Sequence, residues 1–181
     1  MTRAEHSSEQ IPVCPECDFK WSASASEVLA TISGAPSGYR DLLDGQPAPA
    51  WHRRPQPNVW SPIEYLAHVV DAVDWYRERI MAVLSHRGVR LEPFDWDEAC
   101  SQRRYSERNP IHTLNELERA SVELGELLDG LDATSWRQAG VGSTDNGPRT
   151  VLTLGRRAAH EVRHHHRDIE RQTGRGHNLT S

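Results

Sequence analysis

Apolar residues recur at helical spacing in the segment WSPIEYLAHVVDAVDWYRERIMAVLSH, residues 60–86 of the chain. The positions that follow this i, i+3, i+4 pattern are Ile63, Leu66, Ala67, Val70, Val73, Ile80 and Leu84. Ser61 and Pro62 are suited to the N-cap and the first helical position, and Glu64 can complete a capping box. The pattern therefore predicts a long helix that begins after Ser61 and ends by Gly88.

Three more segments predict helices. PIHTLNELERASVELGELLDGL (residues 110–131) and TVLTLGRRAAHEVRHHHRDIERQ (residues 150–172) each have helical periodicity, and Gly174 is placed to end the second. DFKWSASASEVLATI (residues 18–32) predicts a shorter helix, which Gly34, Pro36 and Gly38 should interrupt before YRDLLDG continues it.

The segments between these helices show neither sustained periodicity nor strand alternation. Residues 46–58 are rich in proline and predict a loop, and residues 89–109 and 132–149 predict long connections. Amphipathic helices without strands predict an all-α fold, a four-helix bundle. We expect an N-terminal extension over residues 1–23, the bundle over residues 24–174 and a C-terminal tail over residues 175–181.

Composition narrows the class of protein. With 36% hydrophobic residues, 26% charged residues and no apolar run of about 18 residues, the 181-residue chain suits one globular domain and no membrane span. The N-terminus lacks the apolar core of a secretory signal, so we expect a cytoplasmic protein. A net charge of −5 without a basic patch argues against nucleic-acid binding.

The basic residues are dominated by arginine. Lys20 is the sole lysine among the 21 basic residues. A GC-rich coding genome produces such a bias, and actinobacteria are one source of such genomes. In that host mycothiol would be the expected small thiol.

A histidine cluster stands out in AAHEVRHHHRDIE, residues 158–170. His160 and His164 lie four residues apart, which places both imidazoles on one helix face. His165 and His166 point about 100° and 200° away from His164, because each helical residue turns about 100°. An H-x-x-x-H pair by itself is also common as ordinary exposed or hydrogen-bonded residues.

His68 makes a metal site more plausible than that ordinary alternative. It lies in the middle of the predicted helix over residues 60–86, beside the apolar stripe. His68, His160 and His164 together would form a three-histidine site between two helices. Three protein ligands leave coordination positions open, as catalytic metal sites do. Asp71 and Asp168 could orient the imidazoles, whereas Glu64 more simply caps its helix.

The motifs WSPIEYLAHVVD, SWRQAGV and HEVRHHHRDI, in this order, resemble those of the DinB-like superfamily, which includes mycothiol-dependent maleylpyruvate isomerases and thiol S-transferases. The resemblance implies a four-helix bundle with up-down-down-up topology. It also implies a divalent metal on His68, His160 and His164, with zinc expected and nickel or iron as alternatives. This chain has His160 where the best-studied isomerases have glutamate, and we expect no counterpart of their second domain in the residues after 174.

The CPEC element offers a second site. Cys14 and Cys17 have the C-x₂-C spacing of half a structural zinc site, for which Cys100, His6 and His52 are candidate partners. Similar CPxC elements precede DinB-like domains in actinobacterial proteins. A pair of reduced surface cysteines is the simple alternative, and a redox motif lacks the βαβ context it needs.

Three functions remain open. The first is a metal-dependent thiol S-transferase or isomerase that uses a mycothiol-type thiol and an electrophilic substrate, in a pocket walled by Trp60, Trp75 and Trp136. The second is a non-catalytic metal-binding module for stress response or sensing. The third is hydrolysis, with Glu161 as the nearest carboxylate to the ligands. The partners we expect are small molecules and, in the assembly, a second copy of the chain as a homodimer.

Overall fold

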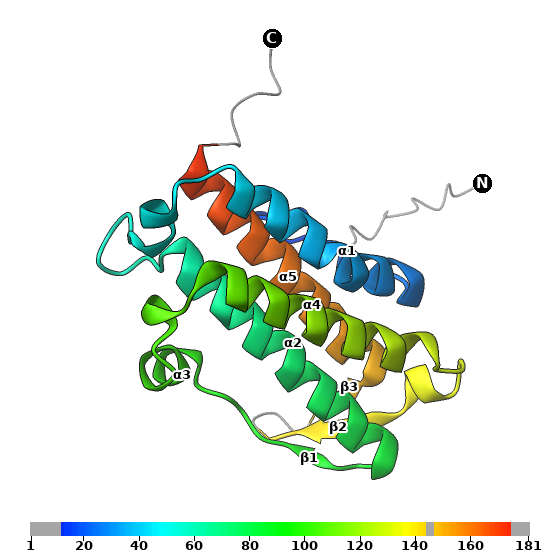
Figure 1. Ribbon diagram of the computed structural model, residues 1–181. Helices are drawn as coiled ribbons and strands as arrows, with labels where there is room; N and C mark the ends of the chain where they lie inside the picture. The colour runs from blue at the N-terminus through cyan, green and yellow to red at the C-terminus, as the bar shows by residue number, and fades with distance from the viewer. Residues whose placement is uncertain (1–11, 144–146, 175–181) are drawn as a thin grey trace, which may run out of the picture.

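The computed structural model describes residues 12–143 and 147–174, and its main feature is a bundle of four long helices (Figure 1). They are α1 (Ala25–Asp44), α2 (Pro62–Ser85), α4 (Pro110–Asp129) and α5 (Val151–Thr173). The predicted all-α four-helix bundle is thereby confirmed.

The directions of the helices follow from which residues meet. α1 and α5 run in the same direction, α2 runs opposite to α5, and α4 runs in the same direction as α2. The contacts that set these directions are Val28 with Gly155, Tyr39 with Val162, His68 with Glu161, Tyr76 with Arg157, Asp74 with Arg119 and Arg77 with Glu123. In chain order this is the up-down-down-up arrangement.

Helix α1 is continuous, so the predicted interruption is wrong. Pro36 lies inside the helix, between the buried residues Ala35 and Tyr39. Gly38 packs closely against α5, because an added Cβ would lie 3.2 Å from Nε2 of His166 and that ring would have to shift. Tertiary packing along α1 and α5 thus overrides the local preference of glycine and proline to end a helix.

The predicted helix ends are largely confirmed. The side chain of Glu64 accepts hydrogen bonds of 2.8 Å from the backbone N–H and from the hydroxyl of Ser61, with Pro62 as the first helical residue. Thr150 caps α5, and Gly174 ends it with a positive φ of 73°. These caps fix where α2 and α5 start and stop, and hence which residues face each other across them.

Short elements occupy the predicted connections. They are η1 (Ala48–His52), β1 (Arg90–Leu91), α3 (Trp96–Gln102), η2 (Tyr105–Glu107), η3 (Ser135–Arg137), β2 (Ala139–Gly142) and β3 (Pro148–Thr150). β1 pairs with β2 in parallel, and β2 pairs with β3 antiparallel. This small sheet lies at the end of the bundle where α2 finishes and α5 begins (Figure 1). Its strands are too short to produce a detectable alternation in the sequence.

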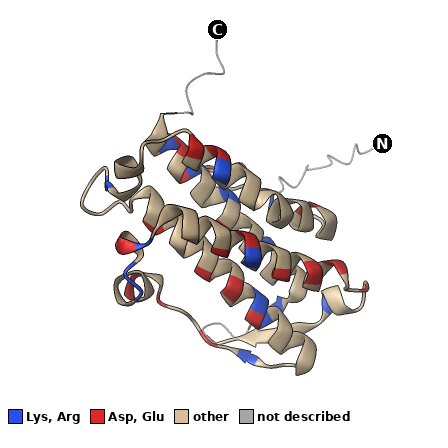
Figure 2. Cartoon of the chain, in the orientation of Figure 1, with Lys and Arg blue, Asp and Glu red and all other residues tan. Residues whose placement is uncertain are grey.

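The core is formed by the inner faces of the four helices, with fully buried residues such as Ile32, Leu66, Leu117 and Val151. In the view of Figure 2, acidic and basic residues are interspersed along the outer faces of the helices. Among the described residues, no helix combines the length and the hydropathy that crossing a membrane requires.

The segment before α1 packs along α5. Val13 and Lys20 form an antiparallel bridge, so the CPEC element folds into a tight turn. The side chains of Arg156 and Arg163 on α5 donate hydrogen bonds of 2.7 and 2.6 Å to the backbone carbonyls of Ala23 and Cys17. The Cys-containing extension is therefore held against the helix that carries the histidine cluster.

Candidate metal centre

Helix α5 presents two pairs of potential ligands, offset from each other by one residue. His160 and His164 form one pair with four-residue spacing, and Glu161 and His165 form the other. Because one residue turns the helix by about 100°, the two pairs face different neighbours. Glu161 and His165 face α2, whereas His160 and His164 face the N-terminal segment.

The first group joins α5 to α2. Oε2 of Glu161 lies 3.1 Å from Nε2 of His68 and 3.3 Å from Nε2 of His165. His68 is 3% exposed, and all three ligand atoms lie within 4.8 Å of one another. The group therefore has two imidazole nitrogens and one carboxylate oxygen gathered between two helices.

These separations fit a shared metal ion. Zinc binds histidine nitrogen and carboxylate oxygen at about 2.0–2.2 Å, so two such donors in a tetrahedral site stand roughly 3.4 Å apart. The distances of 3.1 and 3.3 Å from Glu161 to the two imidazoles are close to that value. Two histidines and one carboxylate also suit iron or another divalent metal, and three ligands leave coordination positions open.

Asp168 orients one of these ligands. Its Oδ2 accepts a hydrogen bond from Nδ1 of His165 at 2.7 Å, which leaves Nε2 of that ring for the metal side. Carboxylates behind ligating histidines fix the ring tautomer in this way. A third potential cluster, formed by His164, His165 and Asp168, shares its histidines with the two main groups and is not independent of them.

The electrostatics of the first group differ between its members. Burial alone would lower the pKa of His165, but its hydrogen bonds with Asp168 and Glu161 raise it. Burial lowers the pKa of His68, which keeps its imidazole neutral. Burial alone would raise the pKa of Glu161, but its hydrogen bonds with His165 and His68 lower it. A neutral imidazole and an ionised carboxylate are the forms that bind a cation.

Aromatic rings surround the first group. The ring of His68 lies 5.3 Å from Trp60 and 4.6 Å from Trp96, and His165 stacks on Tyr65 at 5.0 Å. Trp75 in turn contacts Trp96 at 5.5 Å. Of the three tryptophans expected around the site, Trp60 contacts His68 directly, Trp75 reaches it only through Trp96, and Trp136 packs against Gly155.

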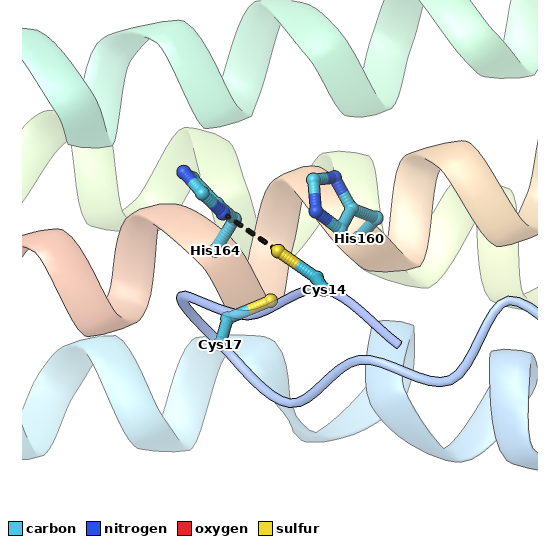
Figure 3. A group of neighbouring side chains, drawn as sticks. All are labelled: Cys14, Cys17, His160 and His164. Atoms are coloured by element: carbon cyan, nitrogen blue, oxygen red, sulfur yellow. Dashed lines mark hydrogen bonds between the residues drawn. The ribbon is translucent and has the colours of Figure 1, made fainter. Parts of the chain in front are cut away.

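The second group lies on the neighbouring face of α5. Cys14, Cys17, His160 and His164 each offer one ligand atom within 4.8 Å of the others. Figure 3 shows the CPEC turn lying over α5, with the two sulfur atoms and the two imidazoles directed toward one another. Sγ of Cys14 lies 3.6 Å from Nδ1 of His164.

The structure therefore divides the predicted three-histidine set. His160 and His164 come together as expected, but His68 lies with Glu161 and His165 instead. The register of α5 relative to α2 differs by one residue from the prediction, because the pair that faces α2 is Glu161 with His165. The carboxylate of the first group comes from Glu161, the residue after the predicted ligand His160.

Two of the three candidate partners of the CPEC cysteines, Cys100 and His52, lie elsewhere. Cys100 packs beside Glu64 and Tyr105, and Nδ1 of His52 lies 2.9 Å from the carbonyl of Ser106. His6 falls outside the described residues.

Two carboxylates proposed as orienting groups have other partners. Glu64 caps α2 and pairs with Arg54, as the simpler interpretation predicted. Asp71 accepts a hydrogen bond from the hydroxyl of Tyr105 and pairs with Arg103 at 2.7 Å. Of the three proposed orienting carboxylates, Asp168 contacts a residue of the group, and that residue is His165.

Sequence reasoning missed His165 and Glu161 as partners of His68. A signal was present, since Leu154 and Ala158 are buried on α5 and Glu161 and His165 continue this row at helical spacing. The pairing of C-x₂-C with H-x₃-H, the common ligand spacing of zinc sites, was also present in the sequence.

Comparison with known proteins yields a family and a fold. The family model of the DinB superfamily matches residues 31–169. Among solved structures, YfiT from Bacillus subtilis, described as a probable metal-dependent hydrolase with an unusual four-helix bundle topology, superposes with a TM-score of 0.73. The match covers 83% of this chain and 87% of YfiT at 14% sequence identity, so it shows a shared fold. No curated protein matches the chain.

Proposed function

Because the chain belongs to the DinB superfamily, we propose that it is a metal-dependent enzyme whose centre is held by His68, Glu161 and His165. The reaction we propose is transfer of a low-molecular-weight thiol of the mycothiol type to an electrophilic substrate, or a thiol-assisted isomerisation. The observation that carries the proposal is the convergence of two imidazoles and one carboxylate from two helices, at separations that suit one ion.

Each protein group has a distinct task in this proposal. When bound, a divalent ion with open coordination positions would supply Lewis acidity and lower the pKa of a thiol ligand. His68 and His165 provide nitrogen donors, the first kept neutral by its burial, and Glu161 provides the negative charge. Asp168 holds His165 in the tautomer that directs Nε2 toward the site. The rings of Trp60 and Trp96 shield His68 from water.

A nearby cavity supports an anionic substrate. A cavity of about 280 Å³ is lined by Trp75, Tyr76, Arg79 and Arg157, among others. Arg157 lies one helical turn before Glu161 on α5, although the three donor residues themselves do not line the cavity. Arg79 stacks over the ring of Trp75 at 3.2 Å, and its Nε is buried without a hydrogen-bond partner.

Burial lowers the pKa of Arg79 to about 10, so its guanidinium stays charged near neutral pH at some desolvation cost. A carboxylate or phosphate on the substrate would offset this cost with a charge-assisted hydrogen bond. We therefore propose that the electrophile carries an anionic group that Arg79 and Arg157 bind.

The test is thiol consumption by protein loaded separately with zinc, nickel and iron. Mycothiol and glutathione would each be supplied with a matched pair of electrophiles, one bearing a carboxylate and one neutral. We expect metal-dependent turnover and a preference for the anionic electrophile. Arg79→Gln should raise KM about tenfold for the anionic substrate alone, which corresponds to ~1.4 kcal/mol, while the metal content stays unchanged. If no thiol is consumed with any metal, the non-catalytic module becomes the better account.

Hydrolysis is a second candidate, favoured by the description of the structurally similar YfiT as a probable metal-dependent hydrolase. An ion at the same three residues could activate water instead of a thiol. Glu161 is a ligand in our proposal and is therefore not free to act as a base. Release of product from ester or amide substrates in the absence of any thiol would favour hydrolysis over thiol transfer.

A further inference from the structure

The CPEC turn is shaped to present two sulfur atoms on one side. The backbone N–H of Cys14 donates to the carbonyl of Phe19, and the N–H of Asp18 donates to the carbonyl of Cys14, both at 2.9 Å. Asp18 adopts a positive φ of 57°, a conformation that aspartate tolerates better than most residues. The backbone N–H groups of Glu16 and Cys17 point at the sulfur of Cys14. Such N–H groups stabilise a thiolate.

Helix α5 supplies two more donors opposite this turn. His160 and His164 lie one turn apart, with ring centroids 5.0 Å from each other. Zinc–sulfur and zinc–nitrogen bonds of about 2.3 and 2.1 Å at a tetrahedral angle place the two donors about 3.6 Å apart. The observed distance from Sγ of Cys14 to Nδ1 of His164 is 3.6 Å.

One nitrogen in this group is otherwise unexplained. Nε2 of His160 is buried and has no hydrogen-bond partner among the described residues. Buried polar atoms in native proteins almost always have a partner, so an unpaired one on a ring that belongs to this group points to an absent ligand. The ring is also fixed in place, because it stacks on Trp21 at 4.7 Å and meets the edge of Phe19 at 5.6 Å.

The surroundings orient the group further. Nε2 of His164 lies 3.4 Å from Oε2 of Glu16, so the ring can donate to this carboxylate while Nδ1 faces the sulfur of Cys14. Cys17 is fully buried, and Arg163 holds its carbonyl at 2.6 Å. The turn and the helix are thus positioned against each other by contacts outside the four donors.

We propose that Cys14, Cys17, His160 and His164 form a closed zinc site that fastens the N-terminal segment to α5. Four donors fill a tetrahedral zinc shell, which is the signature of a structural site, and the C-x₂-C and H-x₃-H spacings are those such sites use. Two thiolates select zinc over magnesium or calcium. This site has its own donors and does not depend on the proposed function of His68, Glu161 and His165.

The test uses the full chain loaded with cobalt(II) in place of zinc. Thiolate ligands produce a sulfur-to-cobalt charge-transfer absorption that nitrogen and oxygen ligands do not. We expect this absorption in the wild-type protein, together with the visible bands of tetrahedral cobalt. Cys14→Ser and Cys17→Ser should each remove it, whereas Cys100→Ala, at the remaining cysteine, should retain it. X-ray absorption at the zinc edge of His68→Ala protein, which we expect to keep the sulfur-ligated ion alone, should give a shell of two sulfurs and two nitrogens, and the averaged wild-type shell should contain sulfur.

Elemental analysis separates this site from the first one. We expect the wild type to bind two ions per chain, His68→Ala to keep the sulfur-ligated ion, and the cysteine variants to keep the other. The wild-type spectra decide the question even if a cysteine variant does not fold. Absence of sulfur from the wild-type zinc shell, or isolation of a Cys14–Cys17 disulfide under reducing conditions, would overturn the proposal.

Discussion

Two faces of α5 carry potential metal ligands. The two ligand pairs are offset by one residue along the helix, and the groups that they join differ in donor atoms. The face toward α2 offers Glu161 and His165, which meet the buried His68. The face toward the N-terminal segment offers His160 and His164, which meet two cysteines. Both pairs have four-residue spacing, so local spacing cannot distinguish them. The partner that each face meets decides what each pair can do.

Donor type and donor number separate the two groups. Two nitrogens and one oxygen leave room for a further ligand, which catalysis requires. Two sulfurs and two nitrogens fill the shell and leave no such room. The neighbours differ accordingly, since the three-donor group is surrounded by aromatic rings such as those of Trp60 and Trp96, whereas the four-donor group is covered by the turn that supplies its cysteines. One helix can therefore support a reactive centre on one face and a structural one on the next.

The largest effect should come from removing the carboxylate of the three-donor group. Glu161→Gln keeps the size of the side chain but removes its charge, and we expect loss of that ion together with all metal-dependent turnover. Removal of a residue that only orients a ligand typically lowers metal affinity 10–100-fold. Loss of a direct ligand should therefore lower metal affinity by more than about 100-fold. The measurements are metal stoichiometry and activity. Retention of full activity would exclude Glu161 as a ligand.

The double variant Cys14→Ser/Cys17→Ser should affect stability rather than chemistry. Zinc present at about 1,000 times its Kd would stabilise the folded state by ~4 kcal/mol. For a chain of this size, loss of that zinc should lower the Tm by roughly 10 °C. Calorimetry with and without a chelator measures the effect, and Cys100→Ala serves as the matched cysteine control. If the chelator lowers the Tm of the double variant as much as it lowers the Tm of the wild type, a structural role for zinc at the two cysteines would be contradicted.

A smaller and more selective effect is expected from Asp168→Asn. The amide can present its NH₂ group to Nδ1 of His165 and so favours the wrong tautomer of the ring. We expect metal affinity at the three-donor group to fall about 10–100-fold, while the sulfur-ligated ion is retained. Competition with a chromogenic chelator measures both sites. Arg171→Gln, which removes the other partner of Asp168, is the control for a general disturbance of α5.

Most of the fold could be predicted from the sequence because its signals are local. Ser61, Glu64 and Thr150 cap their helices through contacts within one turn. The interruption predicted in α1 failed for the opposite reason, since the space beside Gly38 is filled by the distant His166. The two- to four-residue strands β1, β2 and β3 carry too little pattern to be recognised.

The candidate site could be predicted as a set of residue types but not as a set of contacts. His68 and the cluster on α5 were identified, and CPEC was identified as half of a metal site. Which residues of the cluster face α2 depends on the rotation of α5 about its axis. Packing of the buried stripe through Ala158 and Val162 sets that rotation, and a one-residue error exchanges His160 for Glu161. The cysteines and His160 are more than 140 positions apart in the chain. Only the tertiary fold brings them together, and no local sequence pattern predicts that contact.

The smallest effect is expected from substitution of His166, the last histidine of the HHH run. This residue shows what a histidine of α5 does when it faces neither of the two ligand groups. Its ring meets the edge of Tyr39 at 5.4 Å and packs against Gly38. It therefore acts as a packing residue between α1 and α5. His166→Ala should lower the free energy of unfolding by about 1 kcal/mol, the usual size of a lost aromatic contact. Both metal ions and the catalytic rate should stay unchanged, which chemical denaturation and elemental analysis would check. A loss of either ion in His166→Ala would mean that α5 is rotated from the orientation described, because only a different rotation brings residue 166 to a ligand position.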